Sequence, residues 1–256
     1  MIPHQCDFPY TKNVLQSLET TLSPGRLALY EKLSAGNLED ALKLYCWNIG
    51  LSQTLYWPLH VFEVTLRNAM ADQMYDTYAD DWYEKIASFS NSRSRKENDE
   101  AVHVIKAKRK LDEDGFTYGH DKIVAAISLG FWLGLLKLEY KDKLWDPLFS
   151  KIFPMLEREE VFRKVNQIKR LRNNVAHHEP ILVFLPKGDK RELFRDYKVI
   201  LKMIRWICPD TAYWVEYHSS LDFFTAWNCC PPVLAMPKLT VTKPGQESNS
   251  QLWHFV

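Results

Sequence analysis

Apolar side chains recur at helical spacing along most of this chain. From Leu38 onward they return every three or four residues, so that they fall on one face of an α-helix. These positions are Ala41, Leu42, Leu44, Tyr45, Ile49, Leu51 and Leu55, and beyond Pro58 they are Val61, Phe62, Leu66, Ala69, Met70 and Tyr75. We expect Pro58 to kink or interrupt this helix. Because the one alternating run, residues 181–185, is weak, the pattern predicts an all-α fold.

Further helices are predicted on both sides of this stretch. Asn37 is a capping residue type, with Glu39 and Asp40 placed favourably in the first turn. The other predicted helices cover residues 13–22, 26–34, 122–138, 141–149, 157–178 and 190–207, with one or two more in 209–227. The polar segment 91–114 is expected to be a solvated helix or part helix and part loop. We expect one domain over residues 1–228 and an irregular tail over 229–256.

The charges nearly cancel, with 33 Lys and Arg against 32 Asp and Glu and a formal net charge of +1. This balance argues against a broad cationic surface for nucleic acid or membrane. Positive charge is concentrated locally in two groups, Lys106, Lys108, Arg109 and Lys110, and Lys164, Lys169, Arg170 and Arg172. Each group is either an ordinary solvated helix face or a small patch for a few phosphates.

The cysteines and the apolar runs suggest the environment of the protein. Five cysteines without a CxxC pair are not a secreted disulfide framework, which predicts a cytoplasmic protein. The longest uncharged stretch, residues 123–136, is shorter than the roughly 18–20 residues that span a bilayer, so no membrane partner is expected. No zinc spacing or Gly-rich phosphate loop occurs, and we expect neither metal nor cofactor.

One arginine of the predicted helix 157–178 lies where an apolar residue would be expected. The apolar stripe of this helix consists of Val161, Val165, Ile168, Leu171 and Val175. At about 100° per residue, Arg172 falls within roughly 40° of the centre of that stripe. A guanidinium cannot lose its charge in a protein. We therefore expect either that buried acids pair with Arg172, or that the stripe opens there into a cleft or a subunit contact.

Two adjacent histidines, His177 and His178, follow on the same predicted helix before Pro180. Histidine titrates near neutral pH and suits proton transfer, whereas arginine suits a phosphate on which negative charge develops. Arg172 and His177 are five residues apart, about 140° on an ideal helix, so they do not share a face. A joint site needs either a distorted last turn or residues from two copies of the chain.

A second segment echoes this one. Leu66-Arg67-Asn68 parallels Leu171-Arg172-Asn173, with Asp72 at the position that corresponds to His177. Glu63 and Arg67 are four residues apart and can pair on one helix face. We expect Glu63, Arg67 and Asn68 to form a buried polar network that supports the active helix; the alternative is that they serve only the fold.

These segments resemble a known family. Residues 172–177, RNNVAH, are similar to the Arg-x4–6-His signature of HEPN domains. With LRNNVAHHEPI, YCWNIGLSQTLYWPLHVFEVTLRNAM and ISLGFWLGLL, the chain resembles the Abi-like (abortive infection, AbiD/AbiF-type) family over roughly residues 13–205.

The resemblance implies an all-α HEPN domain, usually dimeric, that cleaves RNA without a metal in phage defence. It implies that Arg172 holds the scissile phosphate, that His177 is the acid or base and that Asn173 positions nearby groups. His178 would be a second proton carrier or an RNA contact. The RNA-binding residues would include Lys106, Lys108, Arg109, Lys110, Lys169 and Arg170. An antitoxin or small RNA is a possible regulator, and the alternative is a non-catalytic RNA- or partner-binding module.

Overall fold

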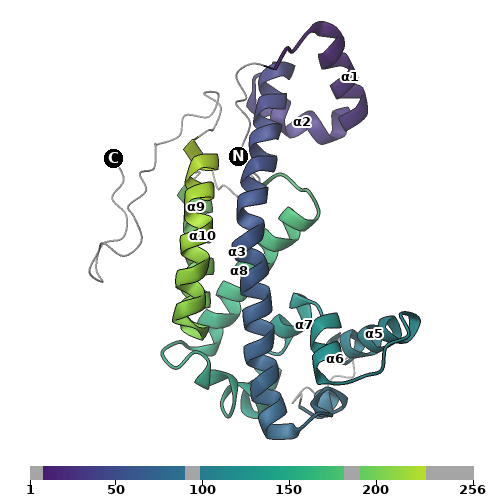
Figure 1. Cartoon of the computed structure of the whole chain (residues 1–256), viewed down its shortest axis with the longest axis vertical. Coiled ribbons are helices and arrows are strands. Elements are labelled where there is room, and N and C mark those ends of the chain that lie inside the picture. Colours follow the sequence, from purple (N-terminus) through teal and green to yellow (C-terminus); the bar gives the residue numbers. More distant parts are fainter. Residues whose placement is uncertain (1–7, 90–98, 182–190, 229–256) are drawn as a thin grey trace. The chain divides into compact units, whose positions relative to one another are not determined.

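The computed structural model describes residues 8–89, 99–181 and 191–228. Every regular element within these residues is a helix, which confirms the all-α prediction (Figure 1). Ile181 lies in a short 3-10 turn rather than in a strand, while residues 182–185 and the predicted tail 229–256 lie outside the described residues.

The helices closely follow the predicted segments. The longer ones are α1 (Lys12–Leu22), α2 (Pro24–Leu33), α3 (Leu38–Tyr78), α5 (Asp99–Glu113), α6 (His120–Ala126), α7 (Leu129–Gly134), α8 (Arg158–Ala176), α9 (Arg191–Ile207) and α10 (Pro209–Asn228). The short ones are η1 (Trp82–Lys85), α4 (Ile86–Phe89), η2 (Leu138–Tyr140), η3 (Lys141–Trp145) and η4 (Phe149–Lys151). The ends predicted for the helices at residues 13–22, 26–34, 157–178, 190–207 and 209–227 differ by one or two residues, as is usual because helix ends fray. The single short helix predicted at 141–149 was wrong, because η3 is a π-helical turn and η4 a separate 3-10 turn.

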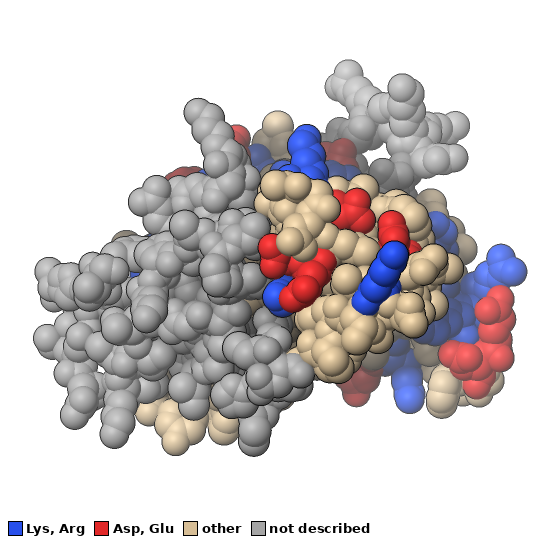
Figure 2. All heavy atoms as spheres, turned by 90° about the horizontal axis from the view of Figure 1, so that it is seen from above, with Lys and Arg blue, Asp and Glu red and all other residues tan. Residues whose placement is uncertain are grey.

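Charges of both signs are present on the described surface. Figure 2 shows blue Lys and Arg side chains and red Asp and Glu side chains on the one face that it draws. Such mixing fits the near-neutral net charge of +1. None of the described helices combines the length and apolar character that a bilayer crossing requires.

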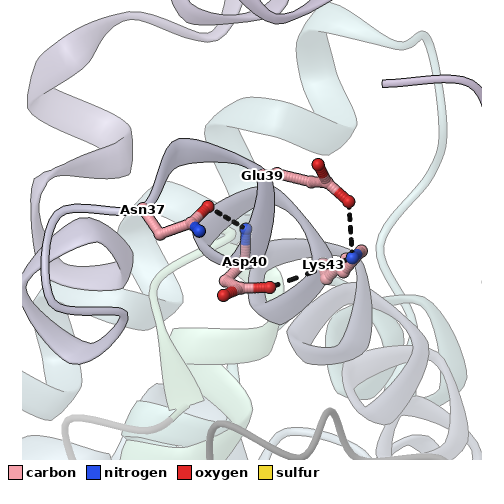
Figure 3. Close-up of polar contacts among 4 residues, drawn as sticks. All are labelled: Asn37, Glu39, Asp40 and Lys43. Atoms are coloured by element: carbon pink, nitrogen blue, oxygen red, sulfur yellow. Dashed lines mark hydrogen bonds and ion pairs between the residues drawn. The ribbon is translucent and has the colours of Figure 1, made fainter. Parts of the chain in front are cut away.

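The first turn of α3 is capped as its sequence predicts (Figure 3). The Asn37 side-chain oxygen accepts a hydrogen bond from the Asp40 backbone N–H at 3.1 Å. Lys43 Nζ lies 2.6 Å from Glu39 and 3.8 Å from Asp40. The cap therefore satisfies one of the backbone donors that every helix start leaves unpaired.

Pro58 does not interrupt α3, which is an α-helix from Leu38 to Tyr78 (Figure 1). Of the two effects expected of Pro58, the interruption was wrong, because packing outweighs local propensity at this position, and the kink stays a prediction. A proline inside a helix costs about 3 kcal/mol, since it lacks an N–H and crowds the preceding turn. Leu55, Leu59 and Phe62 are at most 2% exposed, and burial of each such side chain contributes roughly 1.5–3 kcal/mol.

The predicted helix 122–138 is two helices, α6 and α7, and this is a further correction. The helix stops at Ile127 (φ −83°, ψ 136°), and Ser128 is also extended (φ −78°, ψ 160°) at the N-cap of α7. Serine favours this cap position, and the two glycines of α7 weaken helix propensity. The result is a short helix whose glycines accept close neighbours, as described below.

The chain forms two compact units, each with its own apolar core. Among the described residues, the first contains residues 8–58, 174–181, 191–197 and 213–228, and the second contains residues 59–89, 99–173 and 198–212. Buried side chains of the first unit include Leu27, Tyr30, Leu44, Trp47, Leu51, Ile181, Tyr197 and Val215. Those of the second include Phe62, Leu66, Met70, Trp82, Phe131, Trp132, Tyr140, Phe153, Val161 and Ile168.

Candidate functional site

Arg172 on α8 is paired with Glu63 on α3. Its Nε donates to Glu63 Oε2 at 2.9 Å, and its Nη2 donates to Glu63 Oε1 at 3.4 Å. The carboxylate side chain is 18% exposed and the guanidinium side chain 37% exposed. A two-point contact of this kind holds the plane of the guanidinium in a defined orientation.

The surroundings of Arg172 match its position on the helix. The five apolar residues of its stripe, Val161, Val165, Ile168, Leu171 and Val175, are all buried. Two outcomes had been expected as alternatives, an acidic partner or an opening into a cleft. Both occur, because Arg172 binds Glu63 and also lines a cavity of the second unit.

This cavity has a volume of about 380 Å³. We call it the Arg172 cavity. Helices α5, α7 and α8 supply most of its wall. Its lining residues are Glu100, His103, Ser128, Leu129, Gly130, Leu133, Gly134, Lys137, Phe162, Lys169, Arg172 and Asn173.

The charged groups of the wall differ in their pairing. Lys137 Nζ lies 2.9 Å from Glu100 Oε1, and the Tyr140 hydroxyl donates to Glu100 Oε2 at 3.2 Å. The Glu100 side chain is only 4% exposed, so these partners compensate a nearly buried carboxylate. Lys169 forms no ion pair within the described residues. A cation in the wall is therefore available to an anionic ligand.

Two glycines of α7 allow other helices to approach closely. A Cβ on Gly134 would lie 1.9 Å from Glu100 Oε1, so this position leaves no room for a side chain. A Cβ on Gly130 would meet Lys169 Nζ at 3.6 Å, an ordinary contact. The pair is spaced four residues apart, which places both glycines on one helix face.

The supporting network predicted from the sequence is only partly present. Glu63 pairs with Arg172, and the described residues contain no pair of Glu63 with Arg67, although the four-residue spacing allows one. Arg67 Nε instead lies 3.4 Å from Asn68 Oδ1, and Asn68 is exposed. Both residues line a different cavity, of about 300 Å³, with Asp72 and His120. Of the three residues, Glu63 is the one whose hydrogen bonds reach α8 in the described part of the chain.

The two histidines lie where α8 ends, in the first unit. His177 directly follows Ala176, the last helical residue, and both histidines are exposed. His178 has φ 58°, and its N–H donates to the Val175 carbonyl at 3.3 Å. The next N–H, that of Glu179, donates to the Asn174 carbonyl at 2.8 Å. This is the Schellman arrangement, in which a left-handed residue closes the helix.

Two long-range contacts hold this helix end. Arg26 Nη1 donates to the His178 carbonyl at 2.8 Å. The buried Asn48 side chain accepts the Ile181 N–H at 2.9 Å. Because the backbone is held on both sides of Glu179, the turn that carries the histidines has a defined geometry.

The predicted basic patch on α5 is smaller than its sequence suggests. Lys108 pairs with Glu84 and lies over the rings of Tyr83 and Tyr118. Arg109 pairs with Glu113 at 3.0 Å. Lys106 and Lys110 are exposed, as is Arg170 on α8. Roles in RNA binding remain predictions for all six residues, Lys169 included.

Several lining residues of the Arg172 cavity were missed by sequence reasoning. Glu100, Lys137 and Phe162 carry no motif. Gly130 and Gly134 carried a usable signal, because two glycines four residues apart in a short apolar helix indicate close packing against a neighbour.

By its second unit, the protein belongs to the class of all-helical proteins in which an oriented arginine lines a cavity with other cations. The family comparison gives a more specific assignment. The family model described as Abi-like protein matches residues 29–182, and the chain belongs to this family. Neither the curated proteins nor the solved structures yielded a match.

Proposed function

We propose that the protein is a metal-independent endoribonuclease of the HEPN type and acts as an effector of abortive infection. The proposal joins membership of the Abi-like family to the chemistry of residues 172–178. The single observation that carries it is the held arginine. Glu63 occupies Nε and Nη2 of Arg172, while Nη1 has a 3.5 Å contact to Asn173 and the side chain lines a cavity.

An arginine held in this way suits a phosphate. Its orientation is fixed before the ligand arrives, so little reorganisation accompanies the growth of charge in the transition state. Its charge persists at every pH at which RNA is stable. Lys169 adds a second cation in the wall of the same cavity.

In the proposed reaction His177 removes the proton from the ribose 2′-hydroxyl. The 2′-oxygen attacks the adjacent phosphorus, the bond from phosphorus to the 5′-oxygen breaks, and a proton is delivered to the leaving oxygen. The products are a 2′,3′-cyclic phosphate and a 5′-hydroxyl end. Arg172 stabilises the charge on the phosphate oxygens, Asn173 positions the guanidinium, and His178 is a second proton carrier or an RNA contact.

Induction of the chain in bacterial cells tests this function. We expect growth arrest and new RNA 5′-hydroxyl ends with the wild-type chain, and neither with Arg172→Ala or His177→Ala. Arg163→Ala, an exposed arginine on the same helix, is the matched control. Cleavage by the purified protein should persist in excess EDTA. A strict requirement for Mg²⁺ would overturn the proposal, and RNA binding without cleavage would favour the non-catalytic alternative.

A mixing experiment tests the proposed dimer. If Arg172 of one copy acts with His177 of another, then Arg172→Ala and His177→Ala chains regain activity when they are combined. Without recovery, and with dimers demonstrated by light scattering, the site lies within one chain.

A further inference from the structure

The Arg172 cavity extends well beyond the arginine, and the proposed reaction uses only one side of it. Its volume of about 380 Å³ is near the lower limit of ligand pockets, which hold roughly 300–1,000 Å³. A space of this size suits one compact ligand unit rather than a length of polymer.

The charge balance of the cavity suits a singly charged anion. Lys137, Lys169 and Arg172 are cationic, whereas Glu100 and Glu63 are the acids paired with two of them. The cations exceed the acids by one, and Lys169 is the cation that has no ion pair among the described residues. A phosphodiester of RNA carries a single negative charge and would balance it.

The rest of the wall offers an apolar surface with polar groups beside it. Leu129, Leu133 and Phe162 are apolar, whereas Gly130 faces the Ser128 and Lys169 side chains. Flat bases bind such surfaces by stacking or apolar contact. The Ser128 hydroxyl and the Asn173 amide can each donate and accept hydrogen bonds, as the edge of a base requires.

We infer that the cavity binds one unpaired nucleotide of the RNA, the nucleotide that adjoins the phosphate at Arg172. That phosphate lies between Arg172 and Lys169, and the base of the nucleotide lies beside Phe162. A base stacked within a duplex cannot enter a recess between helices, so the nucleotide in the cavity is unpaired. This inference rests on the proposed function and adds the subsite that holds the nucleotide next to the phosphate at Arg172.

Binding by a non-cleaving chain tests the inference. The full-length His177→Ala protein is titrated with a fluorescent single-stranded RNA and with the same RNA annealed to its complement. We expect Gly130→Leu, which fills the cavity, and Lys169→Gln, which removes the free cation, each to weaken single-strand binding about tenfold. Lys169→Gln should also reduce the slope of log Kd against log salt by about 0.7.

The matched controls are Arg163→Gln, an exposed cation on α8, and Gly25→Leu, where an added Cβ would meet nothing within 4 Å. Thermal melts establish that each variant is folded, and Lys169→Gln keeps the test decisive if Gly130→Leu does not fold. Equal affinity of the parent and the folded cavity variants would overturn the inference, as would equally tight duplex binding.

Cleavage assays separate this inference from the proposed function. If the wild-type chain cuts RNA while Gly130→Leu and Lys169→Gln change neither binding nor base preference at the cut, the cavity inference fails alone. If the cavity variants weaken binding while the wild-type chain cuts no RNA, the nuclease proposal fails and the nucleotide site remains.

Discussion

Glu63 on α3 holds Arg172 on α8 through two hydrogen bonds, 2.9 and 3.4 Å long, across 109 positions of sequence. The contact joins the two longest helices within the second unit. It also leaves the Arg172 side chain 37% exposed.

Glu63→Gln should reduce both the stability of the protein and the RNA cleavage that we propose. The amide keeps the shape of the side chain but removes the charge that orients Arg172. Since the pair is only partly buried, we expect a loss of about 1 kcal/mol in the free energy of unfolding and about a tenfold loss in single-turnover RNA cleavage. Urea unfolding and cleavage rates measure the two effects. The control is Asp81→Asn, which removes an exposed i,i+4 pair with Lys85 and should alter neither.

Gly134→Ala should destabilise the second unit, because its new Cβ would overlap the Glu100 carboxylate at 1.9 Å. Overpacking of this kind typically costs about 1–3 kcal/mol. Gly130→Ala is the matched control on the same helix, since its Cβ meets no atom closer than 3.5 Å. Thermal unfolding compares the two variants. Equal melting temperatures would contradict the close approach of Glu100 to α7.

His178→Gly separates stability from function at the end of α8. A histidine at φ 58° bears a left-handed strain that glycine does not. We expect the glycine variant to be more stable by about 0.5–1 kcal/mol. If His178 carries protons or binds RNA, cleavage falls although stability rises. Differential scanning calorimetry and cleavage rates provide the two readings, with His178→Asn as an intermediate for stability. Unchanged cleavage would restrict His178 to closing the helix.

Tyr197→Phe should change the alkaline stability of the first unit. Burial raises the pKa of Tyr197 above its usual value of 10.0. Its hydroxyl lies 2.9 Å from Ser219 Oγ, which itself donates to the Val215 carbonyl, so Tyr197 is the donor to Ser219.

The direction in which the stability changes with pH follows from the protonation states of Tyr197. The fold favours the neutral phenol of Tyr197. The contribution of this phenol to the free energy of unfolding is therefore complete below about pH 10 and is lost as the pH rises through the folded-state pKa. Tyr197→Phe should cost about 1 kcal/mol near pH 7 and lose less stability above pH 10. Urea titrations at several pH values measure the difference in unfolding free energy between the wild-type protein and Tyr197→Phe, which should become smaller above pH 10. The same change at Tyr213, which is 54% exposed, should not produce it.

Local sequence signals predicted much of the helical architecture. The cap at Asn37, the buried stripe of α8 and the all-α class follow from residue type and spacing, which act over a few residues. The unusual position of Arg172 was also visible, because a permanent charge in an apolar stripe requires a partner or an opening.

Tertiary packing decided what those signals could not. Glu63 has a possible partner four residues away in Arg67 but binds Arg172 instead. Pro58 remains within α3 because the side chains around it are buried, and residues 122–138 divide into two helices at Ser128. The Arg172 cavity is assembled from segments up to 73 residues apart, from Glu100 to Asn173. Hydrophobic burial and charge pairing act through space, so the partners of Arg172 were determined only when the chain folded.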